Sequence, residues 1–456
     1  MKTYYTLLFN RTFKLSLLLL LIQQFIIASS TYWIAISAER IATQQPYFLY
    51  LSLFIVSLII VYIPSVISIS LLEKAKIIAL NSYHTQFRTL FYGLSNINAD
   101  KNQKKIMMPY LSSESFLVID ESYRFIYDWI AVILNVLFNI ITLAFLLEAN
   151  IIYAYFIGLL LVLGFILKFN TNVAEKSRQA QQDRTELQHH LSQIWDNCTL
   201  GNQYNDHLYQ QDLLKKQQSL LFSAVKSKQF NNIVSSVGML IMMLPVIMLI
   251  LFLFYQYRTS PAMLAVLIAT LPRQVIMLQY CYSIISYITQ WSALKAKLNG
   301  LLQALIPPPT NSDIYQRILW DKFNVSTSAN LNIEMINLEY LKNNLPKQGR
   351  ITIQAPNGAG KSSYLIWLKT QLAEQAYYLP TYHHLQFSQT NTTHCSTGEV
   401  LKYNLNELQQ HLDQKIKVIM LDEWNANLDA ASTNEVDQLI EKLSQLFLIV
   451  EVRHHI

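Results

Sequence analysis

The sequence predicts an α-helical membrane domain with six transmembrane helices, followed by an α/β domain. Three observations support this fold class. Only 14% of the 456 residues are charged and 52% are hydrophobic, whereas soluble domains carry about 25% charged residues. The apolar residues gather in six long stretches within the first two thirds of the chain. Beyond them, short β-rich runs alternate with helical patterns, which is typical of a parallel sheet.

Each apolar stretch is long enough to cross a bilayer, which takes about 20 mostly apolar residues in a helix. The stretches lie near residues 13–37, 46–72, 125–147, 151–169, 233–255 and 262–284. One such stretch could be a buried core helix, but six of them favour membrane spans. The first is longer than the apolar core of a signal peptide and is interpreted as a retained span. The lipid bilayer is therefore an expected partner.

The basic residues predict an orientation, because Lys and Arg are enriched in cytoplasmic loops. They are frequent in the long loops after the second and fourth stretches and scarce in the three short loops. Both termini and both long loops are therefore expected in the cytoplasm. Helical periodicity persists in the long loops, which predicts helical extensions of the spans. The compact layout and the lack of an organelle signal favour a bacterial inner membrane. Nucleic acid is a disfavoured partner, because the basic residues follow membrane topology and no base-stacking module is present.

The chain is divided into a membrane domain over residues 1–300, a Pro-rich linker over 301–330 and an α/β domain over 331–456. Strands are expected over 331–338, 350–354, 417–421 and 446–452, and helices over 362–374 and 433–446.

A P-loop follows the strand at 350–354 and precedes a helix, which is the context this motif requires. Its expected nucleotide-binding residues are Asn357, Gly358, Ala359, Gly360, Lys361, Ser362 and Ser363. Backbone N–H groups of such a loop surround phosphates, Lys361 would reach the β- and γ-phosphates of ATP, and Ser362 would bind Mg²⁺. A Gly/Lys turn without a ligand is the alternative. It is disfavoured because four of only ten glycines fall between Gly349 and Gly398.

Two acidic residues end the apolar run Val418–Leu421, which reads as a buried parallel strand. Asp422 suits Mg²⁺ coordination, and Glu423 suits orienting or deprotonating an attacking water. An acid after a strand is often only a helix cap, but together with the P-loop this pair indicates nucleotide hydrolysis.

These motifs together resemble an ATP-binding cassette (ABC) domain. The resemblance implies that Asn427, Leu428 and Asp429 form the D-loop. It also implies that His454, or alternatively His455, is the catalytic switch histidine. Ser396, Thr397, Gly398 and Glu399 resemble a degraded signature motif that would face the γ-phosphate bound by the opposite subunit. A surface histidine and a plain Ser/Thr/Gly loop are the alternatives.

Six spans followed by such a domain are similar to an exporter-type ABC half-transporter. The resemblance implies an ATP hydrolase that exports a small molecule, peptide or lipid, with ATP and Mg²⁺ as cofactors. It also implies a second half-transporter chain, expected as a homodimer, and coupling helices near 89–97 and 202–208. The alternative is an ATP-gated or partner-dependent transporter or regulator with little turnover.

Several departures from the family pattern favour that alternative. The segment between Lys361 and Ser396 is short, so the helical subdomain is expected to be small. Thr381 stands where the Q-loop glutamine is expected, with Gln386 and Gln389 as substitutes. Tyr340 and Phe323 are weak candidates for stacking on adenine.

An arginine lies in the middle of the sixth apolar stretch. An intramembrane arginine is costly and usually faces a cavity or a partner. Arg273 and Gln274 are therefore candidates for lining a substrate cavity, where they would contact an anionic or peptide-carbonyl group. The alternative is a shifted span from which Arg273 reaches the interface.

Overall fold

The computed structural model describes residues 7–98, 100–308, 313–328, 338–339, 341–388, 395–412, 415–426 and 428–453. The chain forms two compact units. The helical unit comprises Met1–Tyr83 and Glu114–Leu301, and the sheet unit comprises His84–Ser113 and Leu302–Ile456. Each unit is described by itself.

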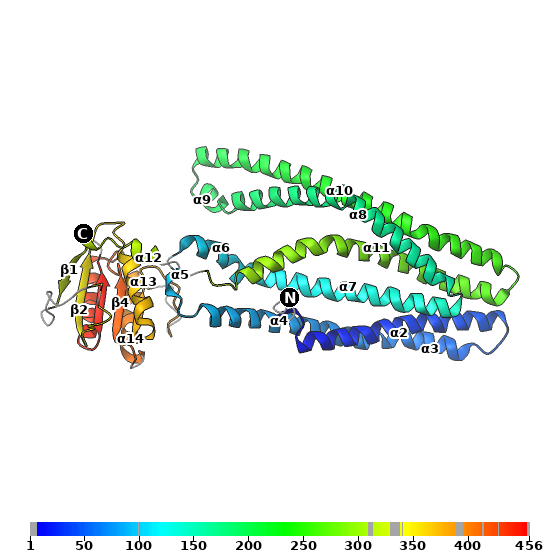
Figure 1. The fold of residues 1–456 in the computed structure, drawn as a ribbon, viewed down its shortest axis with the longest axis horizontal. Helices are drawn as coiled ribbons and strands as arrows, with labels where there is room; N and C mark the ends of the chain where they lie inside the picture. The colour runs from blue at the N-terminus through cyan, green and yellow to red at the C-terminus, as the bar shows by residue number, and fades with distance from the viewer. Residues whose placement is uncertain are drawn as a thin grey trace. The chain divides into compact units, whose positions relative to one another are not determined.

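Long helices make up the helical unit (Figure 1). They are α2 (Arg11–Ala42), α3 (Phe48–Ile60), α4 (Tyr62–Phe91), α7 (Ser113–Leu146), α8 (Asn150–Leu191), α10 (Gln203–Gln256) and α11 (Pro261–Gln303). With α3 and α4 taken as one segment, six helices among the described residues are long and apolar enough to cross a membrane. This finding confirms the six expected spans.

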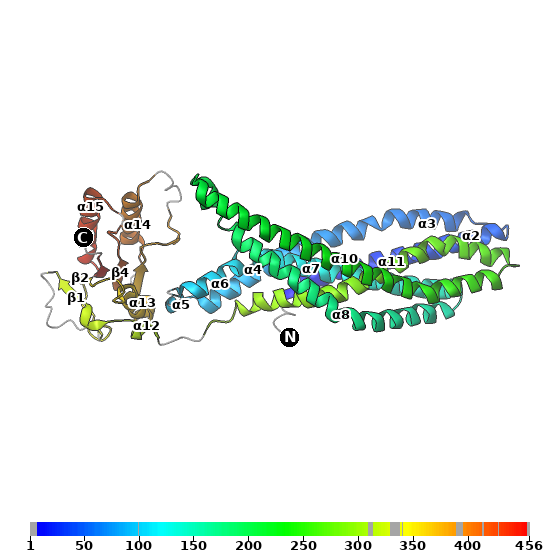
Figure 2. The ribbon, with the colours of Figure 1, turned by 90° about the horizontal axis from the view of Figure 1, so that it is seen from above.

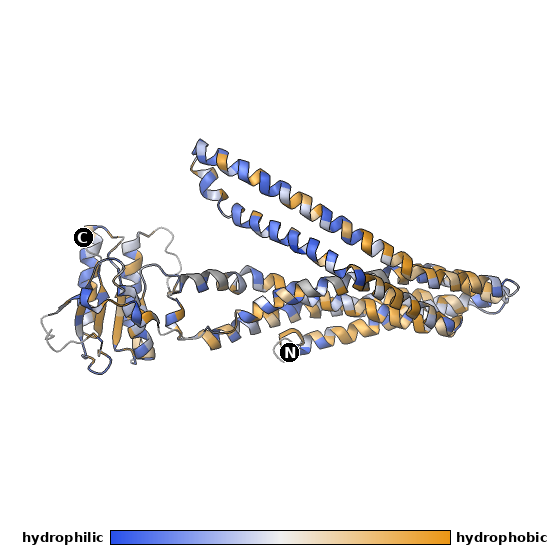
Figure 3. Ribbon diagram, turned by 45° about the horizontal axis from the view of Figure 1, so that its top comes forward, coloured by the Kyte–Doolittle hydropathy of each residue, from blue (hydrophilic) through white to orange (hydrophobic). Residues whose placement is uncertain are grey.

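Three of these helices have more than 40 residues, about twice the length of a span. α8 has 42 residues, α11 has 43 and α10 has 54, whereas a span takes about 20. Figure 3 shows that the halves of α8 and α10 nearest to α9 (Ile194–Thr199) are polar, while the opposite halves are apolar. The second long loop therefore consists largely of helical extensions, as its periodicity predicts. The segment expected as its coupling helix, 202–208, is the start of α10.

Close packing of α8 against α10 explains one glycine of the helical unit. A Cβ atom at Gly158 would lie 2.7 Å from the carbonyl oxygen of Met242. The core around this contact is fully buried and includes Leu143, Val162 and Leu267. Only glycine at position 158 lets the two backbones approach this closely.

The sheet unit contains a five-stranded sheet in the order β1-β2-β5-β4-β3. Its strands are β1 (Asn324–Thr327), β2 (Gly349–Gln354), β3 (Ala376–Leu379), β4 (Val418–Asp422) and β5 (Leu448–Val452). β1 pairs antiparallel with β2, and all other pairs are parallel. β2, β4 and β5 match expected strands. The strand expected at 331–338 lies outside the described residues except for Leu338.

Part of the segment expected as a linker belongs to this unit. It forms α12 (Asp313–Gln316), the 3₁₀-helix η1 (Trp320–Lys322) and strand β1. The apolar residues of this segment pack beneath β2, where Ile318 joins the core formed by Ile351 and Ile353.

Helices cover both faces of the sheet. α13 (Lys361–Leu372) lies on one face, where Tyr364 and Leu368 pack against alternate residues of β2, β4 and β5. α14 (Thr397–His411) and α15 (Ala430–Ser444) pack against each other on the other face (Figure 2). The short α5 (Ser95–Asn98), which follows α4 and precedes α6 (Lys101–Leu111), packs against α13. This contact falls within the segment 89–97 expected to form a coupling helix.

Candidate functional site

The carboxyl ends of the parallel strands bring the predicted site residues to one edge of the sheet. β2 leads into the segment 355–363, which is predicted to be a P-loop and is called the P-loop below. β4 ends at Asp422, and β3 is followed by Thr381 two residues later. Ligands of open α/β sheets bind at this edge, because the loops that follow parallel strands converge there.

Two glycines of the P-loop adopt left-handed backbone conformations, with φ of +81° at Gly358 and +90° at Gly360. Gly360 caps the N-terminus of α13. A Cβ atom at Gly360 would lie 2.3 Å from the carbonyl oxygen of Arg317. The neighbouring Leu319 N–H donates to the Ala359 carbonyl over 3.0 Å. The segment that precedes β1 therefore supports the P-loop from outside.

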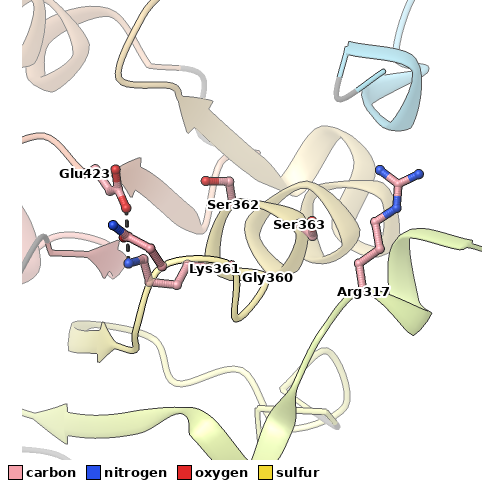
Figure 4. Close-up of a pocket in the computed structure, with 8 residues that line it drawn as sticks. Arg317, Gly360, Lys361, Ser362, Ser363 and Glu423 are labelled. Carbon is pink, nitrogen blue, oxygen red and sulfur yellow. Dashed lines mark ion pairs between the residues drawn. The ribbon is translucent and has the colours of Figure 1, made fainter. Parts of the chain in front are cut away.

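Lys361 and Glu423 lie in direct contact. The Lys361 side chain is buried, and its Nζ donates to the Ala355 carbonyl oxygen over 2.9 Å. The same Nζ lies 3.2 Å from Oε1 of Glu423, an ion pair shown in Figure 4. The structure thus brings together the residue predicted to bind phosphate and the residue predicted to activate water.

Ser362 and Asp422, the predicted metal ligands, are hydrogen-bonded to each other. Ser362 Oγ donates to Oδ1 of Asp422 over 3.1 Å, and Tyr378 OH donates to Oδ2 over 2.9 Å. Thr381 Oγ1 donates to the backbone carbonyl of Asp422 over 2.7 Å. Burial raises the pKa of the Asp422 carboxyl. A serine hydroxyl beside a carboxylate is a set of oxygen donors that fits Mg²⁺.

Tyr378 was not predicted as a site residue. Its phenol holds the Asp422 carboxylate from the neighbouring strand β3, and the only sequence signal for this role is its place just before the Q-loop position. Burial raises the pKa of the Tyr378 hydroxyl, so it stays a hydrogen-bond donor at neutral pH.

A pocket of about 390 Å³ lies over the P-loop. It is lined by Arg317, Asn357, Gly358, Gly360, Lys361, Ser362, Ser363 and Glu423. Ala359 of the same loop, also predicted here, is buried and does not line the pocket. Arg317 was not predicted, and Figure 4 shows its side chain directed away from Lys361 and Glu423.

The signature-like residues form the N-terminus of α14. Ser396 is the N-cap, Thr397 is the first helical residue, and Ser396 and Glu399 form a capping box. The Ser396 N–H donates to Glu399 over 2.7 Å, and this bond lowers the pKa of the Glu399 carboxyl. A Cβ atom at Gly398 would lie 2.7 Å from Cβ of Ser432 in α15. These residues do not line the P-loop pocket, and their action on an opposite subunit stays a prediction.

Two of the residues predicted to form the D-loop, Leu428 and Asp429, directly precede α15. Asp429 is its N-cap, and its Oδ1 accepts from the Ser432 N–H over 2.7 Å, which lowers the pKa of the carboxyl. Leu428 lies beside Gly398. Asn427, His454 and His455 lie outside the described residues, so the catalytic and D-loop roles assigned to them stay predictions.

Phe323 and Gln386 are the described residues among the candidates for adenine stacking and for a substitute Q-loop glutamine. Phe323 packs in an aromatic cluster with Trp320 and Tyr364, with ring centroids 6.0 and 5.9 Å away. Gln386 is exposed, whereas Tyr340 and Gln389 lie outside the described residues.

In the helical unit, Arg273 joins a polar network between three helices. Its Nε donates to Oδ1 of Asn139 in α7 over 2.8 Å, and the same oxygen accepts from Thr31 of α2. Its buried Nη2 has no hydrogen-bond partner in the described part of the chain. Gln274 is buried and donates to Thr270 of its own helix over 3.3 Å.

Comparison with known proteins identifies the fold. No protein-family model matches the sequence, and the search of curated proteins finds no match. Among solved structures, the chain is similar to a bacterial Atm1-family ABC exporter with ATP bound. The TM-score is 0.63 and the sequence identity 9%, over 98% of this chain and 92% of that chain. The chain therefore has the fold of an exporter-type ABC half-transporter, in which six membrane helices are joined to a small α/β domain.

Proposed function

We propose that this chain is one half of an ATP-driven exporter that hydrolyses ATP. One observation carries the proposal. Lys361, Ser362, Asp422 and Glu423 meet at one edge of the sheet, beside a pocket formed by the P-loop. Phosphoryl transfer requires this combination of a phosphate-binding lysine, metal-binding oxygens and a carboxylate that orients water.

The ion pair between Lys361 and Glu423 suggests how nucleotide and water would be handled. The N-terminus of α13 and the N–H groups of the P-loop favour an anion. A triphosphate in the pocket would draw the Lys361 ammonium to its β- and γ-oxygens. The Glu423 carboxylate would then lose its partner and become free to accept a proton from water.

Ser362 and Asp422 would hold Mg²⁺, which neutralises phosphate charge when bound. Tyr378 keeps the Asp422 carboxylate in place by its hydrogen bond, 2.9 Å long. The raised pKa of Asp422 indicates that its charged form is poorly solvated in the described structure. A divalent cation would supply the missing compensation.

The assembled transporter would contain two copies of this chain. In that arrangement the N-terminus of α14, with Ser396 and Gly398, would face ATP held by the P-loop of the other copy. His454 would act as the switch residue. The packing of α5 against α13 supports a mechanical link from the P-loop helix to the loop between α4 and α6.

The substrate path would run through the helical unit, with Arg273 and Gln274 beside it. The unpartnered Nη2 of Arg273 suits an anionic or peptide-carbonyl group. The basic loops favour cytoplasmic termini, and the layout favours a bacterial inner membrane.

ATP turnover of the full chain in lipid nanodiscs tests this proposal. Wild-type protein should hydrolyse ATP, and Glu423→Gln should bind ATP without hydrolysing it. Lys361→Ala should bind ATP weakly. Glu435→Gln is the matched control, because Glu435 pairs with Lys402 on the surface of α15. Equal turnover in wild type and Glu423→Gln would refute hydrolysis at this site.

A second candidate function is ATP-gated transport with little turnover. It is favoured by Thr381, which occupies the place of the Q-loop glutamine and whose hydroxyl is bonded to the Asp422 carbonyl. This candidate predicts ATP binding to wild-type protein with turnover no higher than that of Glu423→Gln.

A further inference from the structure

A carboxylate is buried in the middle of the sheet. Glu451 lies in β5, between β2 and β4, and its side chain is 0% exposed. The register places it opposite Thr352 of β2 and Leu421 of β4. Glutamate is almost never fully buried unless it is paired. An apolar side chain could be buried at this position without hydrogen-bond partners. The partners of Glu451 therefore indicate its role.

Four side chains donate to this carboxylate. Arg350 donates from Nε and from Nη2, each over 2.9 Å, in a bidentate pair. Thr352 Oγ1 and Arg453 Nε donate over 2.6 and 2.9 Å. Trp424 Nε1 donates over 2.8 Å. Bidentate and charge-assisted bonds of this kind are among the strongest in proteins. Glu451 and the four side chains that donate to it are called the Glu451 anchor below.

The two arginines are themselves held by α15. Arg350 contacts Asp437 and Glu441 over 2.6 and 3.2 Å, and Arg453 also pairs with Asp437. The anchor therefore joins β2, β5 and α15.

One member of the anchor directly follows the candidate catalytic residue. Trp424 is 6% exposed, and its indole is held at the edge by Glu451 and on its face by Arg453, whose guanidinium lies 5.3 Å from the ring centroid. Glu451 lies in β5 and Arg453 directly follows this strand, which precedes the predicted switch histidine in the sequence.

The backbone of Glu423 requires such support. Its φ is +44°, a left-handed conformation that is strained in a residue with a side chain. Such strain persists only where the surroundings over-determine the conformation. The Glu423 N–H donates to the Val452 carbonyl over 2.9 Å. Trp424, the residue after Glu423, is bonded through its indole to Glu451 of the same strand. Glu423 and Trp424 are therefore both bonded to β5.

We propose that Trp424 and Glu451 are positioning residues that hold Glu423 in its strained conformation and so direct its carboxylate into the P-loop pocket. The inference rests on the proposed function, because this position matters only if Glu423 activates water. Displacing a catalytic group by about 1 Å can lower the rate by about 100-fold. Trp424 does not line the P-loop pocket, so its replacement should change kcat for ATP more than KM.

Trp424→Phe tests the anchor in the full chain in nanodiscs, with kcat and KM for ATP as readouts. This change removes the Nε1 donor and keeps an aromatic ring. We expect kcat to fall at least ~10-fold while KM changes less than ~2-fold, because a small displacement affects chemistry more than binding. Trp367→Phe is the matched control. Trp367 packs on the opposite face of the sheet, and its indole N–H makes no hydrogen bond within the described part of the chain.

Glu451→Gln and the double variant complete the experiment. If the indole acts through Glu451, the double variant should be no slower than the slower single variant. Glu451→Gln can impair folding, and Trp424→Phe keeps the inference testable in that case.

The outcomes separate the inference from the proposed function. Equal kcat values in Trp424→Phe and Trp367→Phe would overturn the inference while leaving hydrolysis intact. A parallel change of kcat and KM would do the same, because it would mean that the anchor supports the whole site. Wild-type turnover no higher than that of Glu423→Gln would refute the proposed function, and the inference would fall with it.

Discussion

Replacing Gly360 with alanine tests how tightly the P-loop is supported by the segment that precedes β1. Gly360 has φ of +90°, and a Cβ atom there would lie 2.3 Å from the Arg317 carbonyl oxygen and 3.0 Å from Cα of Ile318. Gly358 is a matched control. Its φ is +81°, but a Cβ atom there would have no neighbour within 4 Å in the described structure.

The two substitutions share one penalty and differ in the other. A left-handed conformation costs an alanine about 1–2 kcal/mol, and both variants incur this cost. Gly360→Ala also forces a carbonyl to move by roughly 1 Å, and overpacking of this kind costs about 1–3 kcal/mol more. Its loss in the free energy of unfolding should therefore be about two-fold larger than that of Gly358→Ala.

Thermal unfolding of both variants in nanodiscs measures this difference. For domains of about 150–250 residues, 1 kcal/mol shifts the midpoint by about 2–4 °C. Gly358→Ala should lower the midpoint of the sheet unit by a few degrees, and Gly360→Ala by clearly more. Equal shifts would refute the close approach of Arg317 to the loop.

Three further predictions concern single charged residues. Burial raises the pKa of Asp422, so the contribution of this residue to the stability of the ligand-free sheet unit becomes more favourable as the pH falls through that pKa, above the ordinary value of 3.8. Asp422→Asn should raise the thermal midpoint at pH 7, lose that advantage toward acidic pH and abolish the effect of Mg²⁺ removal on ATP binding. A lower midpoint at pH 7 would contradict this reasoning. Asp429→Asn should keep the helix cap and the midpoint, whereas Asp429→Ala should lower it, because alanine cannot cap; equal midpoints would exclude a capping role. Arg273→Gln should abolish stimulation of ATP turnover by anionic compounds, whereas Arg258→Gln, between α10 and α11, should not; stimulation that survives in Arg273→Gln would exclude the contact.

The membrane helices and the strand, loop and helix around the predicted P-loop could be predicted because their signals are local, whereas phosphate binding by the loop stays a prediction. A span needs only a long apolar run, and the P-loop needs Gly358, Gly360 and Lys361 at fixed spacing after a strand. The proximity of Lys361 and Glu423 could be expected from the rule that ligand sites lie where parallel strands end, whereas their ion pair appears only in the structure. β1 and β3 were not predicted, because they have only four residues each and gain their stability from neighbouring strands. The helix α14 was not predicted either.

The rest of the site depends on contacts between distant residues. In the sequence, Glu451 is only a charged residue within an apolar strand. Its role depends on the contact with Arg350, which is 101 positions away in the sequence. The sequence predicts Gly398 as part of a signature-like loop, and the structure adds that a Cβ atom there would lie 2.7 Å from Cβ of Ser432. Tyr378 reveals its role only through the register between β3 and β4. None of these contacts leaves a periodic or spaced pattern in the sequence.

The length of α10 also has a mechanical consequence. Its 54 residues make a rod about 80 Å long at 1.5 Å per residue, of which a membrane takes about 30 Å. With α8 packed along it, the remaining ~50 Å would act as a lever arm. A tilt of about 5° within the bilayer would carry the α9 end through about 4 Å at this helical rise. A small tilt of the helix within the bilayer would therefore become a displacement close to one helical turn at the α9 end. A proportionally smaller force applied at the α9 end would produce the same tilt.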